Sequence, residues 1–139
     1  MTARNWPRRP CPETTGSRYD YELATAAQLR TMRPGLREWL PAVTSDPDLL
    51  DELLLTLDEL ASKGLRHGLA PVRVSVAPSA GDLLLAVSDA VPECAPEPAT
   101  GRDPAQGGMG LNLVADLSIA SGWDVQDGRK HVWACMSRG

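Results

Sequence analysis

The stretch LLDELLLTLDELASKGLRHGLAPVRVSVAPSAGDLLLAVS (residues 49–88) combines the pattern of a long helix with the patterns of two strands. Leucine recurs every three or four residues between positions 49 and 60, which predicts an amphipathic helix over residues 49–67 with its apolar face on a sheet. Asp46 is the predicted N-cap, followed by Pro47 at the first helical position. Gly68 is the predicted end of the helix.

Two β-type segments follow, over residues 71–77 and 82–88, and the short join between them favours an antiparallel hairpin. Residues 24–40 also have helical spacing, and we expect Pro34 to kink or split that helix. The remaining elements predicted are a strand over 18–23, a helix over 111–121 that Gly122 ends, and a closing hairpin of 123–126 and 131–136 around Asp127–Lys130. This order predicts an α+β fold, a two-layer α/β sandwich with a mixed, mostly antiparallel sheet and its helices on one face.

Composition narrows the function classes. The chain has 139 residues, enough for one domain with a core, and a net charge of −4, so no overall basic field attracts nucleic acid or anionic lipid. Aromatic residues make up 4%, which disfavours stacking platforms for single-stranded nucleic acid. Three widely spaced cysteines and the absence of a signal-peptide core or membrane span favour a cytoplasmic protein.

Proline and glycine mark the boundaries of this domain. Residues 1–17 form a basic, proline-rich segment that we expect to be a disordered tail, and residues 18–139 form the domain. A second cluster spans residues 91–110 and ends in GGMGL (residues 107–111) at the start of a predicted helix. Glycines let a backbone approach a ligand closely, and a helix start suits phosphate, but the motif alone fits a flexible loop equally well.

Several short motifs follow one another along the chain. They are LDELASKGLRHG (residues 57–68), PVRVSV, GDLLLAVSDA, the proline-rich loop, GGMGLNLVADLSIASGWDV and GRKHVWACM. In this order the motifs resemble the GHKL (histidine-kinase-like) ATPase superfamily. Within it the chain resembles the stand-alone anti-sigma-factor serine/threonine kinases and regulators of actinobacteria. The resemblance runs from about Arg18 to Met136.

The resemblance implies a role for each matching residue. The motif Glu-Leu-x-x-Asn-Ala-x-x-His-Gly aligns with residues 59–68, so that Glu59 is the general base and Lys63 replaces the Asn that ligates Mg²⁺. The adenine-binding Asp falls on Asp89, and residues 91–107 become the nucleotide lid. The phosphate-binding residues are Gly108, Met109, Gly110 and Leu111.

Two departures fall within this site. The ammonium group of Lys63 has no lone pair, so it does not ligate Mg²⁺, although it is able to contact a phosphate. Val91 stands where the adenine pocket often has a smaller residue. As alternatives, Glu59 and Lys63 form an ion pair on a solvated helix face, and Asp89 caps the end of its strand.

The resemblance therefore implies an ATP- or ADP-binding transcription regulator with weakened Mg²⁺-dependent serine/threonine kinase activity. Its partner would be a sigma factor or an anti-sigma antagonist. We expect the chain itself to bind no nucleic acid, membrane or metal directly. Both a monomer and a homodimer are compatible with the sequence. The alternative is a nucleotide-free protein-interaction module on the same fold; a sensor histidine kinase half is disfavoured because no phosphoacceptor helix pair precedes Glu59.

Overall fold

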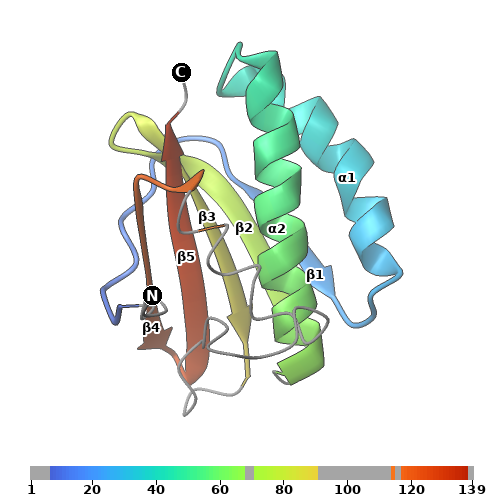
Figure 1. The fold of residues 1–139 in the computed structure, drawn as a ribbon, viewed down its shortest axis with the longest axis vertical. Helices are drawn as coiled ribbons and strands as arrows, with labels where there is room; N and C mark the ends of the chain where they lie inside the picture. Colours follow the sequence, from blue (N-terminus) through green and yellow to red (C-terminus); the bar gives the residue numbers. More distant parts are fainter. Residues whose placement is uncertain (1–6, 68–70, 91–113, 115–116, 138–139) are drawn as a thin grey trace, which may run out of the picture.

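A computed structural model describes residues 7–67, 71–90, 114 and 117–137. Within them, two α-helices cover one face of a five-stranded antiparallel sheet of order β1-β2-β3-β5-β4 (Figure 1). The elements are β1 (Tyr19–Leu23), α1 (Gln28–Trp39), the 3-10 turn η1 (Leu40–Ala42), α2 (Pro47–His67), β2 (Val72–Ser79), β3 (Asp82–Asp89), β4 (Ala120–Gln126) and β5 (Arg129–Ser137). The predicted α+β sandwich is confirmed.

The long helix forms as its sequence predicts. Asp46 Oδ1 accepts a hydrogen bond from the backbone N–H of Asp48 at 3.0 Å, which confirms the N-cap. Along α2 the buried leucines pack on the alternate residues of β2 and β3 that point toward the helices. No helix among the described residues is both long and apolar enough to cross a membrane.

Both hairpins turn through two residues with positive φ. Ala80 and Gly81 (φ 47° and 87°) join β2 to β3, and Asp127 and Gly128 (φ 53° and 73°) join β4 to β5. Two successive left-handed residues are the requirement of a type I′ turn, whose twist matches that of the flanking strands. The predicted Asp-Gly turn is confirmed, whereas the first turn is shorter than expected, because Pro78 and Ser79 belong to β2.

Of the two outcomes predicted for Pro34, a kink or a split, the split does not occur: Pro34 lies inside α1, and burial of Leu29, Met32 and Leu36 on one face holds the helix together across the lost hydrogen bond. The predicted helix end at Gly122 is wrong. Gly122 lies inside β4, which starts at Ala120, so it does not end a helix. Of the predicted helix 111–121, residues 111–113 and 115–116 fall outside the described residues, and residues 120–121 belong to β4.

The N-terminal segment (residues 7–17) packs on the sheet face opposite the helices, although we expected a disordered tail. It starts beside β4, where Pro7 O accepts from Trp123 N at 3.0 Å and Arg9 N donates to Trp123 O at 2.9 Å. Arg9 O accepts from the indole of Trp133 at 3.1 Å, and Cys11 packs on an apolar cluster that includes Cys135. Figure 1 shows this segment, in blue, running from β4 toward β1. Backbone groups make most of these bonds, which explains why the side-chain pattern did not predict them.

Candidate functional site

The end of β3 places Asp89 on the helix-covered side of the sheet. Leu83, Leu85 and Val87 belong to the core beneath the helices, and the two-residue period of a strand gives Asp89 the same orientation. Only 3% of Asp89 is exposed. A buried carboxylate at a strand end is a strong and specific hydrogen-bond acceptor.

Lys130 lies directly across from Asp89 on β5. The two residues are register partners, and Lys130 Nζ is 3.6 Å from Asp89 Oδ2. Lys130 is itself only 7% exposed. Buried charges of this kind are stable only when paired, so each of the two groups offsets the desolvation of the other.

The C-terminal half of α2 approaches the same end of the sheet. A Cβ atom on Gly64 would lie 3.4 Å from the Val72 side chain and 3.6 Å from that of Val87, so the helix backbone lies close to the strands here. Asp89 follows Val87 by two residues, and Lys63 precedes Gly64 by one. The structure therefore brings the turn of α2 that carries Lys63 and the end of β3 that carries Asp89 to one end of the molecule.

Glu59 lies one helical turn before Lys63, and both side chains are half-buried. Its neighbour Asp58 has a different role, since Asp58 Oδ2 pairs with Arg33 of α1 and ties the two helices together. Of the two adjacent acids, Asp58 is therefore the structural one.

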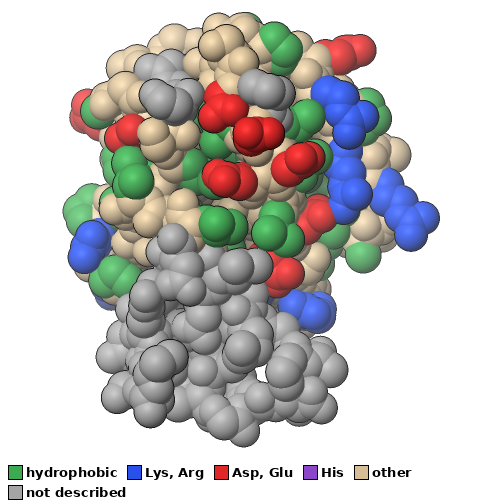
Figure 2. Space-filling view, turned by 45° about the horizontal axis from the view of Figure 1, so that its top comes forward, with side chains coloured by type: hydrophobic (Ala, Val, Ile, Leu, Met, Phe, Trp, Pro, Cys, Tyr) green, Lys and Arg blue, Asp and Glu red, His purple; other side chains and the backbone are tan. Residues whose placement is uncertain are grey.

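The two helices differ in charge. Figure 2 shows acidic side chains gathered near the centre of the helical face and basic ones along one edge. The exposed acids of α2 are Asp48, Asp51 and Glu52, and the exposed arginines of α1 are Arg30, Arg33 and Arg37. The helical face therefore carries an acidic and a basic group of side chains next to each other.

Several residues singled out in the sequence lie outside the described residues. They are Val91, the remainder of the loop 91–107, and Gly108, Met109, Gly110 and Leu111, for which the resemblance predicts phosphate binding. Sequence reasoning missed Lys130. The alternation of β5 around Val132 was a signal for its orientation, but only the strand register shows that it faces Asp89.

Comparison with known proteins agrees with this geometry. A sequence model of the histidine kinase-like ATPase domain matches residues 23–136, from the last residue of β1 into β5. No curated protein matches the chain at a significant level. The match covers both helices described here and nearly the whole sheet, and the α+β fold is that of the family. The chain therefore belongs to the histidine kinase-like ATPase domain family.

Proposed function

We propose that this chain is an ATP- or ADP-binding regulatory protein of the anti-sigma-factor serine/threonine kinase type. Membership of an ATPase-domain family supports nucleotide binding in general. The observation that carries the proposal is Asp89, a buried carboxylate at the end of β3, next to the turn of α2 that carries Lys63.

The described residues fit an adenine base. The exocyclic amino group of adenine is a donor, and Asp89 is an acceptor held on the helix side of the sheet. The ion pair with Lys130, at 3.6 Å, holds the carboxylate in place. By resemblance, residues 108–111 bind the phosphates.

Bound ATP would supply the phosphoryl group for transfer. In that reaction Glu59 accepts the proton of the attacking hydroxyl group, which is a task suited to a half-buried carboxylate on a rigid helix. The proposed partner is a sigma factor or an anti-sigma antagonist whose Ser or Thr receives the phosphoryl group, and the resemblance alone supports this choice.

The residues do not fit the usual Mg²⁺ ligand set. Lys63 stands in the Asn position, and an ammonium group repels a divalent cation instead of ligating it. We therefore assign Lys63 a direct contact with phosphate oxygens, and we expect nucleotide affinity to depend little on Mg²⁺.

The same two lysines favour a second candidate, a nucleotide-free interaction module. Lys63 occupies the metal-ligand position, and Lys130 already neutralises Asp89 within the fold. In this case the buried pair stabilises the end of the sheet, and the helical face of α1 and α2 contacts the partner.

Calorimetry with ADP and ATP, each with and without Mg²⁺, separates the two candidates. The first candidate predicts that nucleotide binds in all four titrations. It also predicts that Lys63→Asn increases the affinity for nucleotide when Mg²⁺ is present. Arg66→Asn, which removes an exposed cation from the same helix, should not have this effect. Absence of binding at millimolar nucleotide would contradict the first candidate and favour the second. If ATP binds, Glu59→Gln should lower the rate of phosphate release from γ-labelled ATP. The same substitution should leave the affinity for ATP unchanged.

A further inference from the structure

A row of polar residues crosses the sheet on the face opposite the helices. Strand register places Glu22 opposite Arg73, Arg73 opposite Ser88, Ser88 opposite His131 and His131 opposite Asp124. All five point away from the helical core, because their neighbours along each strand point into it. Asp89 points the other way, so this row is separate from the proposed nucleotide site.

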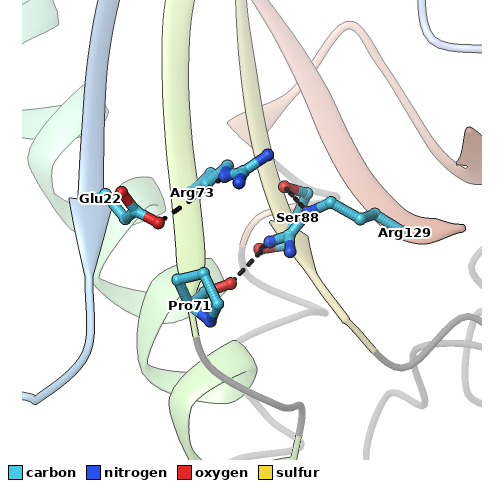
Figure 3. A network of polar contacts seen from close by, with 5 residues as sticks. All are labelled: Glu22, Pro71, Arg73, Ser88 and Arg129. Atoms are coloured by element: carbon cyan, nitrogen blue, oxygen red, sulfur yellow. Dashed lines mark hydrogen bonds and ion pairs between the residues drawn. The ribbon is translucent and has the colours of Figure 1, made fainter. Parts of the chain in front are cut away.

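Arg129 lies over the middle of the row and is held in one orientation. Its Nε donates to Ser88 Oγ at 3.2 Å, and its Nη2 donates to the carbonyl oxygens of Pro71 at 2.6 Å and Ser88 at 3.0 Å (Figure 3). Within the described part of the chain, Nη1 of Arg129 makes no hydrogen bond. Arg73 contributes a second guanidinium group from β2. Among the described residues, its only ion pair is a long one to Glu22, at 3.8 Å.

A cavity of about 870 Å³ opens over this row. Small side chains, Ser75, Ala86 and Ser88, form its floor, and the N-terminal segment forms one wall with residues 11–14. The cavity is therefore a product of small residues on the central strands beside bulkier groups at the edges.

The centre of the cavity is positively charged, and its rim carries four acids and one cation, Arg18, which pairs with Asp20; the other three acids are Glu13, Glu22 and Asp127. Arg73 and Arg129 are neighbouring cations; burial, followed by the charge of Arg73, lowers the pKa of Arg129. Burial and the charge of Arg129 also lower the pKa of His131, although Asp124 and Asp127 oppose that shift, so the imidazole is neutral at pH 7. The rim acids repel an extended polyanion such as nucleic acid, whereas a compact anion reaches the centre.

We propose that Arg73, Arg129 and the hydroxyl groups of Ser75 and Ser88 bind a phosphate group, either free or carried by a phosphorylated side chain. Two guanidinium groups balance the two negative charges of a phosphate dianion. The guanidinium N–H groups that make no hydrogen bond to the described residues, together with the two hydroxyl groups, supply donors for more than the two oxygens of a carboxylate. Arg129 is already ordered by its three hydrogen bonds, so binding costs little side-chain entropy.

The test follows the imidazole signals of His131 by NMR during titration with inorganic phosphate at constant ionic strength. Substitution of His67, the other histidine, assigns the signals. We expect the His131 signals to shift and to saturate as phosphate is added. The affinity for phosphate should fall about tenfold or more in Arg73→Gln, because a charge-assisted hydrogen bond is lost. Arg73 is exposed, so this variant should fold normally.

Controls keep this site distinct from the nucleotide site. Arg37→Gln removes an exposed cation from α1 on the other side of the sheet, and Lys63→Asn alters the proposed nucleotide site; neither should change the phosphate-induced shift of the His131 signals. Acetate should bind more weakly than phosphate. A phosphoserine peptide that saturates at lower concentration than phosphate indicates a protein-borne group, and equal affinity indicates the free ion. A shift that does not saturate with either ligand, or equal behaviour of Arg73→Gln and Arg37→Gln, contradicts the proposal.

Discussion

Lys130→Met removes the ammonium group that faces Asp89 and keeps an unbranched side chain of similar length. At 3.6 Å and an effective dielectric constant of about 20, two unit charges attract each other by about 4–5 kcal/mol. Both residues are buried, so the variant leaves a carboxylate that water reaches poorly. Loss of one partner from such a pair typically costs about 3–5 kcal/mol, and we expect a loss near 3 kcal/mol in the free energy of unfolding.

Urea denaturation followed by tryptophan fluorescence measures this loss, because Trp133 lies buried on β5, the strand of Lys130, and Trp123 lies buried on the adjacent β4. Asp89→Asn and the double variant complete a cycle. If the two charges interact as described, the double variant should lose about 2 kcal/mol less than the sum of the single variants. Additive losses, or a Lys130→Met variant as stable as the parent chain, would show that the two charges do not stabilise each other.

Three further predictions concern the face opposite the helices. Gly122→Ala should lower the free energy of unfolding by about 1–3 kcal/mol in urea denaturation, since a Cβ there would lie 2.9 Å from Trp133 and 3.1 Å from Pro7 O. Burial raises the pKa of Cys11 to about 11 from 9.0, so peptide mapping should find its alkylation by iodoacetamide roughly a hundredfold slower in the folded than in the unfolded chain. Burial lowers the pKa of His131 in the folded chain from its ordinary value of 6.5, so the unfolded chain binds this proton more readily. The free energy of unfolding should therefore fall as pH falls below 6.5. His131→Gln should flatten this dependence in thermal melts at pH 7 and pH 5.

The sequence predicts those parts of the fold that depend on local side-chain patterns. The leucine spacing and the Asp46 cap define α2, and the Asp127–Gly128 pair defines the last turn, because each feature acts within a few residues. Gly122 shows the limit of such reasoning. A glycine after a helical pattern indicates a helix end, yet here the reason for glycine is the approach of Trp133 from the adjacent strand.

Contacts between distant segments account for the rest. The N-terminal segment attaches to β4 and β5 mainly through backbone groups of Pro7 and Arg9, which no pattern of side chains announces. At the candidate site, the motif resemblance predicted Asp89, but not Lys130 beside it. That pairing depends on the register of β3 and β5, which the sequence does not specify by itself.

The most direct test of the central claim is a calorimetric titration of the parent chain and of Asp89→Asn with ADP in the presence of EDTA. Asparagine has nearly the shape of aspartate but loses the charge, and near-UV circular dichroism verifies that the variant is folded. We expect saturable binding to the parent chain without Mg²⁺ and at least a tenfold loss of affinity in Asp89→Asn, because a charge-assisted hydrogen bond to the base is removed. Equal affinity of the two proteins, or no binding by either, would contradict it.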